Sequence, residues 1–151
     1  MNKLLIISFV FLLVTPFAYA QNQVPDCSDA YASPDLLKSN GKMVPIEIVG
    51  VTDPDGDPVT ITVTSITSDE PTATAQGAGG TAKAPDASGV GLSAARVRAE
   101  RSGGGDGRVY AINFTAQDDF GDMCNAQVIV CVPLKSKCIN SGQKYDATKI
   151  N

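Results

Sequence analysis

Polar and apolar residues alternate along several short stretches of the chain after residue 42. The first stretch begins at Met43, where Val44, Ile46 and Ile48 share one face and Glu47 lies on the other. A period of two residues is typical of a β-strand with one buried face. The same alternation predicts further strands over residues 59–64, 94–101, 109–116 and 125–132.

Glycine, proline and aspartate separate these strands and indicate turns. Residues 71–92 are rich in Ala, Gly and Thr without any aromatic residue, which predicts a long loop with at most a weak strand. The Gly-rich segment 102–107 predicts a hairpin between strands 94–101 and 109–116. Four arginines flank this turn and are expected on a solvated sheet face: Arg96, Arg98, Arg101 and Arg108.

At least five short strands with no convincing helix predict an all-β fold, an antiparallel sandwich of the immunoglobulin-like type. The only local helical signal is one turn starting at Ser33–Leu37. The phase of the alternation predicts which side chains face the core. The expected inward set is Ile46, Ile61, Val63, Tyr110, Ile112, Phe114, Val128 and Val130.

The first 20 residues have the pattern of a secretory signal peptide. Lys3 precedes an apolar run, and Ala18-Tyr19-Ala20 is a small-x-small cleavage site before Gln21. We therefore expect residues 1–20 to be a signal peptide, 21–42 an irregular segment, 43–133 the sandwich domain, and 134–151 a polar tail tethered by Cys138. The product is expected to be secreted, extracellular or periplasmic, without membrane insertion after cleavage.

The charge of the chain limits its partners. The formal net charge is −4, and loss of Lys3 with the signal peptide makes it −5. An acidic chain without a basic run argues against nucleic acid and anionic membranes as partners.

Four cysteines, an even number, follow the signal peptide: Cys27, Cys124, Cys131 and Cys138. In an exported chain this predicts two disulfides, and no C-x-x-C pair supports a metal-thiolate site. Cys124 and Cys131 would lie on opposite faces of one strand, about 23 Å apart if it is fully extended. They cannot be joined to each other. Cys27 therefore pairs with one of them and Cys138 with the other.

Asp53, Asp55 and Asp57 alternate through a Gly/Pro turn just before a predicted strand. Calcium prefers six to eight hard oxygen ligands, which such a turn can begin to supply. Ordinary turn chemistry explains the same residues without an ion, and the spacing is not that of an EF-hand. Additional metal ligands are expected from a second acidic turn and two strand ends: Asp118, Asp119, Asp122, Glu70 and Glu100.

Catalysis has little support in the sequence. The chain contains no histidine, which excludes triads and Cys–His pairs that depend on it. A carboxylate pair could still act in a hydrolase, but no motif marks a substrate cleft. We expect a protein that is not an enzyme.

The segment from Val51 to Thr64, with the sequence VTDPDGDPVTITVT, resembles cadherin-like and other immunoglobulin-like modules of bacterial secreted proteins. Two later segments look like further strands and turns of the same modules, Arg98–Tyr110 and Phe114–Asp122. The resemblance covers Met43–Val132 and implies a β-sandwich that serves as a spacer, adhesive or presenting unit. It also implies calcium at Asp53, Asp55 and Asp57, although this chain has one module rather than a tandem array.

The expected function is thus a secreted, non-catalytic binding or structural module, stabilised by calcium, for surface adhesion or extracellular assembly. Its expected partner is a protein or polysaccharide at a surface, or another copy of itself. Two alternatives remain at this stage: a subunit that assembles into an extracellular polymer or surface complex, and a carboxylate-based hydrolase.

Overall fold

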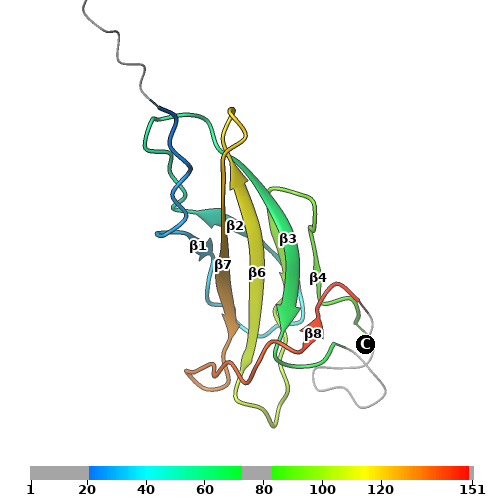
Figure 1. Cartoon of the computed structure of the whole chain (residues 1–151). Helices are drawn as coiled ribbons and strands as arrows, with labels where there is room; N and C mark the ends of the chain where they lie inside the picture. Colours follow the sequence, from blue (N-terminus) through cyan, green and yellow to red (C-terminus); the bar gives the residue numbers. More distant parts are fainter. Residues whose placement is uncertain (1–20, 73–82, 150–151) are drawn as a thin grey trace, which may run out of the picture.

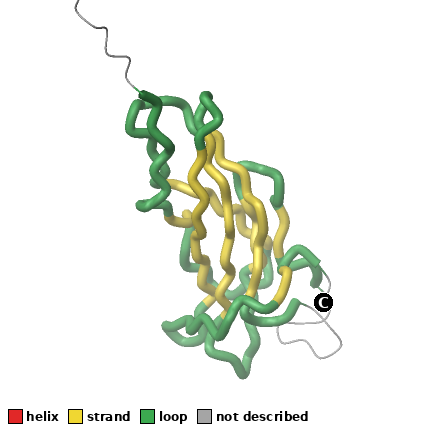
Figure 2. Tube along the Cα trace, in the orientation of Figure 1, coloured by secondary structure: helices red, strands yellow, loops and turns green. Residues whose placement is uncertain are grey.

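The computed structural model describes residues 21–72 and 83–149. The expected signal peptide, residues 1–20, lies outside the described residues, as does the 73–82 part of the predicted long loop. All the regular elements within the described ranges are strands, which form two four-stranded antiparallel sheets (Figures 1 and 2). The predicted all-β sandwich with two disulfides is confirmed.

The first sheet has the order β1-β2-β5-β4. Its strands are β1 (Tyr31–Ser33), β2 (Met43–Val49), β5 (Ala95–Arg98) and β4 (Ala87–Ser88). β2 begins opposite the end of β5, with Met43 paired to Arg98. The two-residue β4 is the weak strand expected in the long loop.

The second sheet has the order β7-β6-β3-β8. Its strands are β7 (Met123–Val132), β6 (Arg108–Gln117), β3 (Thr60–Ser68) and β8 (Tyr145–Asp146). β6 and β7 pair without interruption along their whole length and form a long hairpin. This hairpin extends from one end of the molecule to the other (Figure 1).

The core lies between the two sheets and consists of the inward positions that alternation predicts. Seven of the eight predicted core residues are buried, and Ile61, near the start of β3, is partly buried against the same cluster. The buried seven are Ile46, Val63, Tyr110, Ile112, Phe114, Val128 and Val130.

β3 is longer than its alternation predicts because it contains a bulge. The pairing register with β6 shifts between Val63 and Ser65, so Thr64 is left out of the ladder. A bulge changes the phase of a strand. Ile66 and Ser68 therefore become the buried residues after Val63.

The predicted hairpin around residues 102–107 is wrong. β5 pairs with β2 and β4 in the first sheet, whereas β6 pairs with β3 and β7 in the second. The Gly-rich segment therefore crosses between the sheets. Alternation identifies the two strands and their inward faces, but it carries no information on which strands pair.

The segments on either side of the expected domain also join the sheets. Residues 21–42 contain β1, and Leu36 pairs with Cys131 in a parallel bridge instead of forming the expected helical turn. The C-terminal tail contributes β8, which pairs with β3, and Ala147 is fully buried. The sandwich thus extends beyond residues 43–133.

The disulfides join Cys27 to Cys124 and Cys131 to Cys138. The prediction that Cys124 and Cys131 are not joined is confirmed, and one of the two pairings that the sequence left open is selected. One bridge is attached near the start of β7, at Cys124, and the other near its end, at Cys131, so each end of the sandwich has its own covalent link.

Candidate functional site

The turn between β2 and β3 brings three aspartates together at one end of the sandwich. Asp53 Oδ1 accepts hydrogen bonds from the backbone N–H of Asp55 (2.9 Å) and of Asp57 (3.3 Å). Gly56 has a φ of +84° and donates its N–H to the Asp53 carbonyl (3.1 Å). Aspartate favours this self-bonded turn, and glycine tolerates the left-handed backbone that closes it.

These three carboxylates hold more negative charge than the turn itself neutralises. One oxygen from each of Asp53, Asp55 and Asp57 lies within 4.8 Å of the others. Asp53 Oδ2 is buried without a hydrogen-bond partner. Burial raises the pKa of Asp57, and the charges of Asp53, Asp55, Asp118 and Asp119 raise it further. A buried anionic oxygen without a donor is unfavourable unless a cation neutralises it.

A second acidic turn, Asp118–Asp122, connects β6 to β7 at the same end. Asp118 Oδ1 accepts the backbone N–H groups of Phe120 and Asp122, both at 2.9 Å. Burial acts to raise the pKa of Asp118, but hydrogen bonds from Asn22 and from backbone N–H groups of the turn outweigh it and lower that pKa. We call the region of these two turns the acidic end, made by Asp53, Asp55, Asp57, Asp118, Asp119 and Asp122.

The N-terminal segment lies across both turns. Asn22 Nδ2 donates to Asp118 Oδ2 (2.9 Å) and to Asp122 Oδ2 (2.8 Å). Gln23 donates its backbone N–H and its Nε2 to the carboxylate of Asp55, at 2.7 and 3.0 Å. A shallow hollow forms here, lined by Gln21, Asn22, Asp55, Asp57 and Phe120. These amides donate hydrogen bonds to the carboxylates without neutralising their charge, and no lysine or arginine among the described residues forms an ion pair with them.

The structure brings six of the eight predicted metal ligands to the acidic end and places the other two elsewhere. Glu70 follows the end of β3, and Glu100 follows the end of β5. β3 begins beside the acidic turns, so its far end lies at the opposite end of the sandwich. We call that region the buried-charge end.

Arg108, the first residue of β6, is the centre of the buried-charge end. It is fully buried and forms ion pairs with Asp86 and with Glu70, the latter at 3.3 Å from Nε. Its guanidinium also donates to the Tyr110 hydroxyl (3.1 Å), and that hydroxyl donates to the Arg98 carbonyl (2.9 Å). Arg98 in turn pairs with Asp86 at 3.1 Å. Arginine is therefore the counter-ion of this end.

Two buried carboxylates at this end each keep an oxygen that no donor contacts. Glu70 Oε1 and Glu100 Oε1 are both buried without a hydrogen-bond partner. Burial raises the pKa of Glu100, Asp86 raises it further, and Arg108, Arg98 and Lys83 oppose that shift. The carboxylate oxygens that do lie close together, those of Asp53, Asp55 and Asp57, are at the other end, where the turns contain no arginine among the described residues.

Sequence reasoning missed the burial of Arg108, although a signal was present. Arg108 has the same parity as Tyr110, Ile112 and Phe114, so alternation places it on the inward face of β6. Because arginine is charged, its residue type predicts instead a side chain exposed to solvent. The compensating Asp86 lies in an irregular segment, where no periodicity shows that it faces inward.

The acidic end has the chemistry of a hard-cation site. Carboxylate oxygens suit Ca²⁺, and Asp53, Asp55 and Asp57 could act as ligands from one short turn. The second turn adds negative charge nearby. The remaining ligands of a calcium ion would come from backbone carbonyls and water.

Comparisons with known proteins add no assignment: no family model, no curated protein and no solved structure matches the chain. Among residues 21–72 and 83–149, no helix is long and apolar enough to cross a membrane. The two disulfides indicate an oxidising, non-cytoplasmic location.

Proposed function

We propose that this chain is a secreted, non-catalytic β-sandwich module of the cadherin-like, immunoglobulin-like kind, with a calcium ion at its acidic end. It serves as a binding or structural unit outside the cell. The observation that carries the proposal is the buried Asp53 Oδ2, which has no donor and lies beside the carboxylates of Asp55 and Asp57.

The charge distribution around this atom supports an external cation. Asp57 has a raised pKa because of burial and the surrounding aspartates. The amides of Asn22 and Gln23 donate to Asp118, Asp122 and Asp55, so they leave Asp53 Oδ2 without a hydrogen-bond donor. A divalent ion among the three carboxylates would remove both the repulsion and the unpaired oxygen.

The test is the thermal stability of the disulfide-intact chain from Gln21 to Asn151, measured in EDTA, in calcium and in magnesium. Calcium at ten times its dissociation constant stabilises the folded state by about 1.4 kcal/mol, from RT ln(1 + 10). For a domain of this size that raises the melting temperature by about 5 °C. Magnesium should have a smaller effect, because it demands tighter octahedral geometry.

The variant Asp55→Asn/Asp57→Asn should lose the calcium response and be slightly more stable in EDTA, since it removes the repulsion. The matched control is Glu47→Gln/Asp35→Asn, which removes two exposed carboxylates with no side-chain hydrogen bond or ion pair to the described residues. It should respond to calcium as the unmodified chain does. An unmoved melting curve in 10 mM calcium, about ten times the weakest extracellular sites, would contradict the proposal.

A further inference from the structure

The two ends of the sandwich differ in the charge that they present to solvent. The acidic end holds carboxylates from two turns, and the described lysines and arginines all lie outside those turns and outside the segment 21–30 that covers them. They occupy instead the approach to β2, the segments around β5, the start of β6, and the chain after β7. These residues are Lys38, Lys42, Lys83, Arg96, Arg98, Arg101, Arg108, Lys135, Lys137, Lys144 and Lys149.

The β6–β7 turn at the acidic end projects an aromatic ring. Phe120 is 71% exposed, the highest exposure among the large apolar side chains of the described residues. Asp119 and Asp122 flank it and are exposed as well. We call the turn Asp118–Asp122 the acidic knob. Aromatic side chains bury a large apolar area and contribute strongly to interfaces, so the exposed ring gives the knob an apolar surface that a partner could cover.

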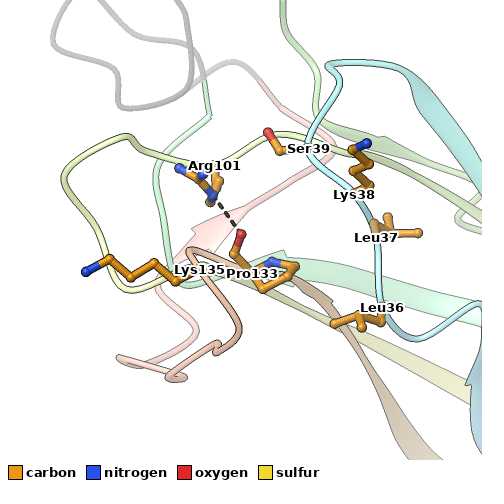
Figure 3. Close-up of a pocket in the computed structure, with 7 residues that line it drawn as sticks. All are labelled: Leu36, Leu37, Lys38, Ser39, Arg101, Pro133 and Lys135. Atoms are coloured by element: carbon orange, nitrogen blue, oxygen red, sulfur yellow. Dashed lines mark hydrogen bonds between the residues drawn. The ribbon is translucent and has the colours of Figure 1, made fainter.

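The opposite end carries an open hollow with the complementary character. Figure 3 shows its lining, which comes from the segment before β2, the segment after β5 and the loop after β7. Lys38 and Lys135 are exposed, and neither forms an ion pair with the described residues. We call this the basic hollow, lined by Leu36, Leu37, Lys38, Ser39, Arg101, Pro133 and Lys135.

The basic hollow also contains apolar side chains that an aromatic ring could contact. Leu36 is 61% exposed and points toward Pro133 in Figure 3. Arg101 donates its Nε to the Pro133 carbonyl at 2.8 Å and its Nη1 to the Ser102 carbonyl at 3.1 Å. These bonds hold the guanidinium at the rim, where its planar face and remaining N–H groups can meet an aromatic ring or a carboxylate.

We propose that the acidic knob of one copy docks into the basic hollow of a second copy, so that the protein assembles head to tail. Phe120 would pack against Leu36 and Pro133. Asp119 and Asp122 would lie among Lys38, Arg101 and Lys135. The occupant is a second copy because the chain itself presents a ring between carboxylates at one end and an apolar floor between cations at the other.

The two surfaces cannot meet within one molecule. β7 has ten residues, so the knob at its start and Pro133 after its end are about 30 Å apart. Each docked copy therefore leaves one knob and one hollow free. A heterologous contact of this kind adds further copies instead of closing as a symmetric dimer. One turn in one hollow is a small interface, so the association should be weak and salt-dependent.

The experiment measures mass against protein concentration, from about 10 µM to about 1 mM, by light scattering in EDTA at low and high salt. The knob variant is Phe120→Ser/Asp119→Lys and the hollow variant is Lys38→Glu/Lys135→Glu. The matched controls change exposed residues elsewhere, Leu92→Ser/Glu47→Lys and Lys42→Glu/Lys144→Glu. Melting curves confirm that each variant folds.

We expect the unmodified chain and both controls to grow past dimers at low salt and to dissociate in about 0.5 M salt, where the Debye length is below 5 Å. The knob and hollow variants should each be monomeric alone. Mixed together they should form a dimer and stop there, because only one intact knob and one intact hollow can meet. A monomer at every concentration overturns the proposal, as does assembly that survives in either variant or a mixture that stays monomeric.

This proposal goes beyond the calcium site and does not depend on it. Its measurements are made in EDTA, and the calcium response is measured as a melting temperature. A calcium response in a chain that stays monomeric would support the first proposal and overturn the second. Assembly without a calcium response would support the head-to-tail proposal and contradict the calcium site.

Discussion

At the acidic end, aspartates from two turns lie together with amides but no described cation, whereas at the buried-charge end Asp86 and Glu70 surround a fully buried arginine. Both ends collect carboxylates where strands begin or finish. They differ in the source of the counter-ion. Arg108 supplies it from within the chain, and its own pKa is raised because Tyr110 and Asp86 outweigh the effect of burial.

This difference separates a structural use of charge from a binding use. A carboxylate that its own chain neutralises holds the fold together and has little left for a ligand. A cluster of three carboxylates with a buried, unpaired oxygen and no ion pair to a described lysine or arginine is available to an ion from outside.

Among single substitutions, removing the internal counter-ion should have the largest effect. Arg108→Met leaves Asp86 and Glu70 buried without their cation, which should lower the free energy of unfolding by about 3–5 kcal/mol. The measurement is urea denaturation at pH 7. The control is Arg96→Met on β5 of the other sheet, where the side chain is exposed and forms no ion pair with the described residues.

A loss as small as that of the Arg96 control would show that Arg108 does not compensate the buried carboxylates. The two ends would then not differ in the way described. Lowering the pH should also reduce the penalty in the Arg108 variant, because the orphaned carboxylates can then take up protons.

The disulfides should contribute unequally to the two ends. Cys27–Cys124 closes a separation of 97 residues at the acidic end, and Cys131–Cys138 closes one of 7 residues at the other. Loop-closure entropy predicts about 4.7 kcal/mol for the first and about 2.4 kcal/mol for the second. Urea denaturation of the two double Cys→Ala variants measures the difference. Equal losses would mean that loop length does not govern the stability of this fold.

Much of the sandwich follows from the sequence because alternation is a local signal. The inward faces of β2, β6 and β7 could be predicted, and parity together with the length of the strand excluded a bridge between Cys124 and Cys131. Partner choice could not be predicted, since β5 alternates equally well beside β6 or beside β2. β4 and β8 have two residues each, too few to show any period.

The candidate site was predictable to the same extent. The acidic turns are local in sequence, and a sandwich hairpin places the β6–β7 turn near the start of β3. Glu70 lies at the end of a predicted strand and Glu100 within the predicted strand 94–101, and neither position tells which end of the molecule the carboxylate reaches. The charge of Arg108 predicts a solvent-exposed side chain, whereas its position in the alternation of β6 places it on the buried face, as the structure shows.

The smallest expected effect concerns Glu100, the least compensated acid of the buried-charge end. Its pKa is raised by burial and by Asp86, so the folded state binds this proton more tightly than the unfolded state does. The stability that it contributes is complete below the unfolded pKa and is lost as the pH rises through the folded pKa. Glu100→Gln keeps the shape but cannot ionise, so it should avoid that loss.

We therefore expect Glu100→Gln to raise the free energy of unfolding at pH 7 by about 1 kcal/mol, the scale of one unpaired buried group. The gain should disappear below about pH 4, near the ordinary range of a glutamate. Urea denaturation across this pH range measures it, with Glu47→Gln at an exposed position of β2 as the control. A loss of stability at pH 7 would show that the charged form of Glu100 is needed beside Arg108. The arginines of the chain would then neutralise all the buried carboxylates at the buried-charge end. The two ends would differ more in their need for an external cation than the raised pKa of Glu100 indicates.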